Sequence, residues 1–159
     1  MQTDPGRAPV PVGLAAPELP FAAPAGVRAV LDRIGRTEDV RFSPDNRRIA
    51  ITAFHENLVV IVDVEIVPGG DDPRIVLTRA TALTAAELAS PHGVDFLDDD
   101  TIVVANRGGR VTVHRLPGGG GRESTAHAPA LAASDPGDIG QPGSVRVVRD
   151  GVGETEVLV

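Results

Sequence analysis

Residues 40–64, which read VRFSPDNRRIAITAFHENLVVIVDV, decide the fold because their pattern returns at residues 94–116 as VDFLDDDTIVVANRGGRVTVHRL. Val40 and Phe42 align with a valine and a phenylalanine that lie 54 residues further along the chain. A third and shorter copy, VRVVRDGVGETEVLV, begins at Val145. A repeat of about fifty residues is typical of β-propeller blades, each of which packs against its neighbours in a ring.

Each repeat contains short runs of β-branched residues that are separated by turn residues. The runs RIAITA, LVVIVDV, TIVVANR and RVTVHRL have the composition of β-strands. The sequence SPDN at residues 43–46 suits a tight turn, because proline presets φ and aspartate or asparagine can bond its own backbone. We therefore expect an all-β chain that forms a partial β-propeller of about two and a half four-stranded blades from a larger ring.

The chain is expected to divide into a tail and a run of blades. Proline and alanine are frequent in the first 24 residues, and proline removes a backbone donor, so this part is predicted to be disordered. A helical stripe also fits VRAVLDRIG, but its similarity to RIVLTR favours a strand that closes the ring. The expected parts are a Pro/Ala-rich disordered tail at 1–24 and a partial propeller at 25–159, with a closing strand at 25–36, blade 1 at 37–83, blade 2 at 91–133 including a flexible excursion at 117–142, and an incomplete blade 3 at 143–159.

Two and a half blades cannot form a closed ring, since each blade buries its faces against two neighbours. We therefore expect an open N-terminal fragment of a larger propeller, with the missing blades beyond Val159, that is marginally stable or self-associating. The register predicts that four side chains point into interfaces between blades: Val40, Phe42, Val94 and Phe96.

The sequence also resembles a known family of repeats. FSPDNRRIAITAF and PHGVDFLDDDTIVVANRGGRVTVHRL are similar to the blades of YVTN-type and lactonase-like β-propellers, which combine Pro-His-Gly, an apolar strand, a Ser-Pro-Asp-Gly turn and a strand ending in asparagine. The similarity covers residues 28–116 and part of 143–159, and Asp98–Asp100 replace Ser-Pro-Asp in the second blade. The resemblance implies the fold, whereas its repeats serve catalytic and non-catalytic proteins alike.

Composition excludes several kinds of chemistry and partner. All 15 basic residues are arginine and there is no cysteine, so lysine-based catalysis, cysteine nucleophiles and zinc–thiolate sites are excluded. A net charge of −7 and 3% aromatic residues disfavour nucleic acid as a partner. The apolar runs are too short to span a bilayer and the N-terminus lacks the pattern of a secretory signal. We therefore expect a cytoplasmic protein without a membrane partner.

Polar residues are predicted to gather at one end of the inner strands, on the rim of the central channel. His92 precedes one inner strand, and Glu38 occupies the equivalent connection in the previous blade. His55, Asn106 and Arg107 belong to the loops that follow the second strands, at the same end. Loop residues on a rigid scaffold are enriched in function, so these five are the candidate ligand-binding residues. Structural roles remain open for His92, as a partner of nearby backbone, and for Asn106, as a turn former. Arg107 also fits the alternative of a solvated loop charge, as most exposed charges are.

The three aspartates Asp98–Asp100 are interpreted as turn formers. They occupy the same hairpin as residues 44–46 of the first repeat, and aspartate is a preferred turn residue. They also lack the alternating ligands and the glycine of a calcium loop. No metal site is predicted from them.

Two classes of function follow, and whether the chain is an enzyme stays open. The favoured hypothesis is a non-catalytic β-propeller scaffold that binds a protein or a small ligand at the channel rim and needs no cofactor. The alternative is a metal-dependent lactonase-like hydrolase. The resemblance implies that Glu38, in TEDVRF, would then help to hold a divalent ion such as calcium, which would polarise a lactone carbonyl.

Overall fold

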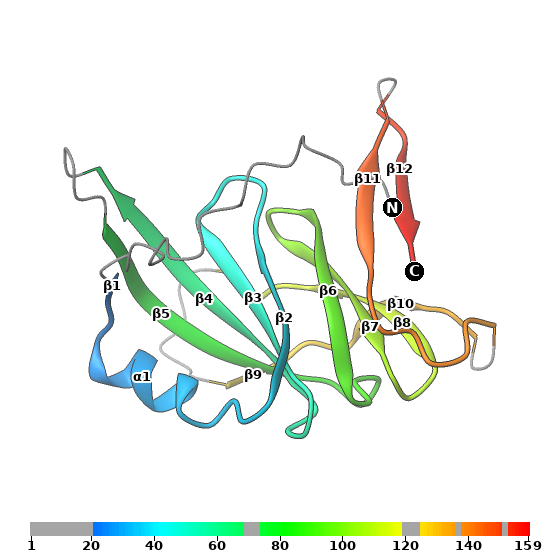
Figure 1. Cartoon of the computed structure of the whole chain (residues 1–159), viewed down its shortest axis with the longest axis horizontal. Coiled ribbons are helices and arrows are strands. Elements are labelled where there is room, and N and C mark those ends of the chain that lie inside the picture. Colours follow the sequence, from blue (N-terminus) through cyan, green and yellow to red (C-terminus); the bar gives the residue numbers. More distant parts are fainter. Residues whose placement is uncertain (1–20, 69–73, 119–124, 136–137, 151–152) are drawn as a thin grey trace, which may run out of the picture.

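The computed structural model describes residues 21–68, 74–118, 125–135, 138–150 and 153–159, and most of them lie in β-strands (Figure 1). The strands of the first blade are β2 Thr37–Phe42, β3 Arg48–Ala53, β4 Leu58–Val67 and β5 Arg74–Thr84. They pair antiparallel in chain order. Two short strands, β1 Phe21–Ala22 and β9 Thr125–His127, pair parallel with β5.

A second four-stranded sheet and a hairpin follow the first blade. The second blade contains β6 Pro91–Asp98, β7 Thr101–Asn106, β8 Arg110–Arg115 and β10 Ala130–Ala133. The beginning of a third blade consists of β11 Arg146–Arg149 and β12 Thr155–Leu158. None of the described sheets closes on itself, so the prediction of an all-β, partial propeller is confirmed.

The two complete blades pack face to face around an aliphatic core. Val94 and Phe96 on β6 are 0% and 2% exposed, and they belong to one buried cluster with Ala50, Val59 and Leu83 of the first blade. These residues share a face because side chains two positions apart on a strand point to the same side. Blade packing therefore fixes how β2 and β6, the two inner strands, lie beside each other (Figure 1).

Val40 and Phe42 do not lie in such an interface, and this part of the register prediction is wrong. They are 48% and 42% exposed. Both point to the face of blade 1 that is turned away from blade 2, as their pairing with Ile51 and Ile49 shows. Within the described residues no further sheet packs on that face, so the aromatic ring stays in contact with solvent.

The closing strand predicted at 25–36 is also wrong, because this segment contains helix α1, Ala25–Leu31. Val27 and Val30 of α1 are buried against Val60 and Val62 of β4, so the helix covers the outer strands of blade 1 (Figure 1). As a helix, this segment buries its apolar stripe against the sheet. As a strand, it would bury only every second side chain. No helix in the described ranges is long and apolar enough to cross a membrane.

The excursion at 117–142 contains more regular structure than expected. It includes β9, which pairs with the first blade, and β10, which completes the second. The strand β10 of blade 2 ends at Ala133. The tail proposed at 1–24 lies outside the described residues for its first 20 positions, and the remainder contributes β1.

Candidate functional site

Asp39 and Asp95 connect each inner strand to the next one. Asp39 Oδ2 accepts a hydrogen bond from Val94 N at 3.2 Å, and Asp95 Oδ2 accepts one from Val147 N at 2.8 Å. Both donors belong to innermost strands, which have an unpaired backbone edge. Thr52 Oγ1 adds a hydrogen bond to the His92 carbonyl at 3.0 Å. The Asp39 and Thr52 contacts hold the start of β6 against blade 1, and the Asp95 contact holds β11 against blade 2.

Glu38 and His92 meet at this end of the blades. Glu38 Oε2, near the start of β2, lies 3.3 Å from His92 Nε2, near the start of β6. The Glu38 side chain is 13% exposed and the His92 side chain 22% exposed, so the pair is partly shielded from solvent. The prediction that both residues lie at one end, on adjacent inner strands, is confirmed.

Two guanidinium groups join this pair. Arg36 forms an ion pair with Glu38 through Nε and Oε1, although the geometry does not give Oε1 a hydrogen bond. Arg107, in the turn after β7, places Nη2 3.4 Å from His92 Nε2. We call Arg36, Glu38, His92 and Arg107 the rim cluster. It combines side chains from both complete blades.

The protonation state of His92 decides which partner its Nε2 atom can bind. His92 Nδ1 contacts the Gly143 carbonyl oxygen, which can only accept, so Nδ1 carries a proton. In the neutral ring Nε2 is therefore an acceptor and suits the Arg107 guanidinium. In the protonated ring Nε2 becomes a donor and suits the Glu38 carboxylate.

His55 reaches the rim cluster through Phe54. The Phe54 ring lies edge-on to His55, with centroids 5.1 Å apart, and edge-on to His92, with centroids 6.2 Å apart. The Arg36 guanidinium lies 5.1 Å from the Phe54 ring centre. Sequence reasoning did not select Arg36 or Phe54. Their positions in the sequence were the available signal, because Arg36 and Phe54 flank predicted strands at the same end of the blades as Glu38 and His55.

Asn106 lies inside blade 2 and not on the open rim. It is fully buried, and its Nδ2 donates to Thr112 Oγ1 at 3.0 Å and to the carbonyls of Val104 and Arg110 at 3.3 Å. Its Oδ1 accepts from Ala89 N at 3.1 Å. The amide thus stabilises the turn between β7 and β8, and a ligand role for Asn106 stays a prediction.

His114 extends this polar network into the interface between the blades. Its Nε2 lies 2.8 Å from Thr112 Oγ1, and its Nδ1 lies 2.8 Å from the Ala128 carbonyl oxygen. Burial lowers the pKa of His114, whereas the bond to Ala128 and the charge of Glu87 act in the opposite direction. The neutral ring, with its proton on Nδ1, satisfies both contacts.

Gly93 allows the chain that leads into blade 3 to cross close to β6. A Cβ atom at this position would lie 2.7 Å from Ser144 Cα and 2.8 Å from Val145 N. The same crossing segment supplies the Gly143 carbonyl that contacts His92. The glycine of the Pro-His-Gly stretch therefore serves the packing of the rim.

The aspartates at the opposite end of the blades form turns, as predicted. Asp98 Oδ1 accepts a hydrogen bond from Asp100 N at 2.8 Å, and Asp99 Oδ1 accepts one from Asp45 N at 2.9 Å. Arg48 binds Asp100 at 2.7 Å. The Asp99 and Arg48 contacts link the hairpins of the two blades. Across the described ranges, histidine, aspartate and glutamate nowhere group in threes that could hold a metal ion.

Comparison with known proteins identifies the family. Residues 4–152 match the family described as the lipoprotein LpqB β-propeller domain. The match supports a β-propeller, but it does not support the YVTN-type or lactonase-like assignment that the repeats suggested. No curated protein matches the chain. Since the match spans nearly all of the 159 residues, the chain belongs to the lipoprotein LpqB β-propeller domain family.

Proposed function

We propose that this β-propeller domain is a non-catalytic scaffold that binds a protein or a small ligand at its rim. The observation that carries the proposal is the convergence of charged side chains from two blades. Glu38 Oε2 and Arg107 Nη2 lie 3.3 and 3.4 Å from the same His92 nitrogen. The backbone beneath them is tied across the blades by Asp39 and Thr52, so the array is preorganised.

Arg107 is a group of the rim cluster that a ligand can reach. It is exposed, and no carboxylate in the described residues pairs with it. Its Nη2 atom would lie 3.0 Å from a Cβ placed on Gly143, so the guanidinium rests on the crossing segment. A guanidinium held in this way suits a carboxylate or phosphate group on the ligand. His55 is also exposed, next to the Phe54 ring, and offers a second polar contact.

The geometry gives less support to the lactonase-like alternative. Both oxygens of Glu38 already face nitrogen atoms of Arg36 and His92. A divalent ion bound by Glu38 would lie close to the guanidinium, which repels it. No group of metal-binding side chains in the described ranges completes such a site. The cytoplasmic location and the absence of nucleic-acid and membrane partners stay predictions.

Site-specific photo-crosslinking tests the proposal. A photoreactive amino acid replaces His55, an exposed residue beside Phe54 at the rim, in one variant and Arg47, an exposed residue of the hairpin at the opposite end, in a matched control, and both variants keep Arg107. We expect a defined partner to crosslink at position 55 and not at position 47. The purified partner should then bind the unmodified domain at least about tenfold more tightly than an Arg107→Ala variant. Equal crosslinking at both positions, or equal affinity for both proteins, contradicts the proposal.

A separate assay addresses catalysis. Calcium-dependent hydrolysis of a lactone that disappears in a Glu38→Gln variant would favour the alternative. We expect no turnover above the uncatalysed rate with or without added calcium.

A further inference from the structure

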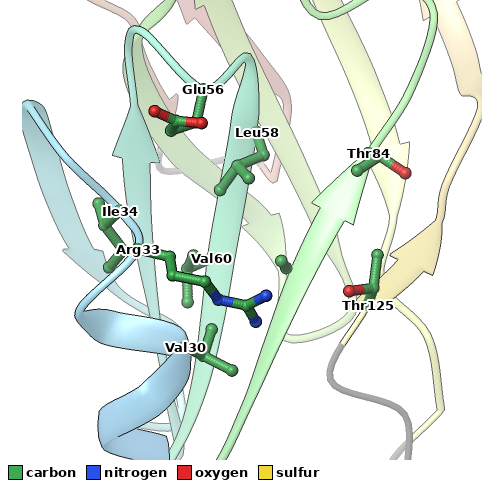
Figure 2. A pocket seen from close by; sticks show the side chains of 9 residues that line it. Val30, Arg33, Ile34, Glu56, Leu58, Val60, Thr84 and Thr125 are labelled. Atoms are coloured by element: carbon green, nitrogen blue, oxygen red, sulfur yellow. The ribbon is translucent and has the colours of Figure 1, made fainter.

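A cavity of about 170 Å³ lies between α1 and the outer strands of blade 1, on the face turned away from blade 2 (Figure 2). Aliphatic side chains from three elements form most of its wall, among them Val30 of α1 and Leu58 and Val60 of β4. Two charged side chains, Arg33 and Glu56, also line it. No residue of the rim cluster lines this cavity, so a function of the cavity would be independent of the rim cluster.

Arg33 presents a positive charge to the cavity. Its Nε donates to the Ala29 carbonyl oxygen at 3.1 Å, which fixes the side chain against the end of α1. Figure 2 shows the guanidinium extending across the cavity, with the Thr125 hydroxyl directed toward it from the other side. Among the described residues, no carboxylate forms an ion pair with Arg33. The terminal nitrogens and the hydroxyl can therefore donate to one anionic group.

The rest of the wall suits a short hydrocarbon chain. A dry protein cavity of about 150 Å³ holds one benzene molecule, so this cavity accommodates a body of about six non-hydrogen atoms. Contact with Val30, Leu58 and Val60 would remove such a chain from water. The combination of an apolar wall and a few placed polar groups is typical of small-molecule sites.

Glu56 determines what the far end of the ligand can be. Its carboxylate lines the cavity beside Leu58, away from the Arg33 guanidinium (Figure 2). A second negative charge on the ligand would be repelled there, whereas a methyl group would not. We propose that this cavity binds a short aliphatic monocarboxylate, whose carboxylate contacts Arg33 and Thr125 and whose chain lies along β4.

Methyl NMR of the chain tests the proposal with three five-carbon probes: pentanoate, pentanedioate and pentylamine. Pentanoate should shift the methyl signals of Val30, Leu58 and Val60 and saturate below about 50 mM, as expected for a weak ligand of this size. Pentanedioate should bind at least about fivefold more weakly because of Glu56. Pentylamine can bind only in the reverse orientation, with its ammonium at Glu56, so any shifts that it causes should be lost in Glu56→Gln and kept in Arg33→Gln.

Variants distinguish binding in this cavity from nonspecific binding elsewhere on the protein. Arg33→Gln should weaken pentanoate binding at least about tenfold, and Arg47→Gln, a matched exposed arginine at another place, should not change it. Glu56→Gln should bring pentanedioate close to pentanoate in affinity. Unchanged methyl signals outside the cavity show that each variant is folded. The proposal is overturned if pentanoate does not saturate, or if Arg33→Gln binds it as well as the parent does.

Discussion

Asp95 of blade 2 accepts a hydrogen bond from Val147 N, 2.8 Å away at the inner edge of blade 3. Its other oxygen accepts from Phe96 N at 2.9 Å. Asp39 repeats both contacts one blade earlier, with Val94 N at 3.2 Å and Val40 N at 2.9 Å. An aspartate on each complete inner strand thus satisfies a free backbone donor of the next blade. Neighbouring blades are therefore joined by these hydrogen bonds as well as by apolar packing.

Replacing Asp95 by alanine should loosen the attachment of the third blade. Asp95 is 9% exposed, and loss of its carboxylate leaves the Val147 and Phe96 amides without their acceptor, at a cost of about 1–3 kcal/mol. Hydrogen exchange should show reduced protection of the Val147 amide. Asp98→Ala is the control, because Asp98 is exposed and bonds only within its turn, and it should cost less than about 1 kcal/mol. Unchanged protection of Val147 in Asp95→Ala would contradict this role.

Two phenylalanines at equivalent repeat positions should differ strongly in their contribution to stability. Phe96 is 2% exposed between the blades, so Phe96→Ala should lower the free energy of unfolding by about 3–5 kcal/mol. Phe42 is 42% exposed on the open face, so Phe42→Ala should cost less than about 1.5 kcal/mol. Urea denaturation of both variants measures the difference. Equal losses would mean that Phe42 is covered in solution, for instance by self-association.

The strands were predictable because their signals are local. Runs of β-branched residues and turns such as SPDN specify hairpins without help from distant parts of the chain. Local sequence signals could not predict helix α1, since the pattern of Val27 and Val30 is compatible with a strand or a helix. The contacts of these valines with Val60 and Val62 favour the helix, and those contacts lie about thirty residues away in the sequence.

The candidate site was likewise predictable from the sequence only in part. Glu38 and His92 were predictable because the start of an inner strand is a defined place in a blade, and the repeat aligns the two places. The burial of Asn106 was not predictable, because asparagine in a loop looks the same in sequence whether it faces solvent or the blade. Its orientation depends on Thr112, on the neighbouring strand β8, and on Ala89.

Gly93 should be sensitive to the smallest substitution. In Gly93→Ala the new methyl group would meet the backbone of Ser144 at 2.7 Å, so the segment that leads into blade 3 must move. We expect a loss of about 1–3 kcal/mol, as for overpacking, together with lower exchange protection in β11 and β12. Gly26→Ala in α1 is the matched control, since nothing lies within 4 Å of a Cβ there. That change should be neutral or stabilising by up to about 1 kcal/mol, because alanine favours a helix.

Acid should destabilise the fold in part through His114. Burial lowers the pKa of His114 below its ordinary value, so the unfolded chain binds a proton at a pH where the folded protein does not. Stability is therefore unaffected by this group above about pH 6.5 and falls as the pH drops below it, by at most about 1.4 kcal/mol per pH unit. A His114→Gln variant should be less stable at pH 7, because contacts with Thr112 and Ala128 are lost, yet its stability should depend less on pH between 7 and 5. His127→Gln, at an exposed histidine, should keep the parent slope. Urea denaturation across this range measures the slopes, and parallel curves for the parent and His114→Gln would show that another group is responsible.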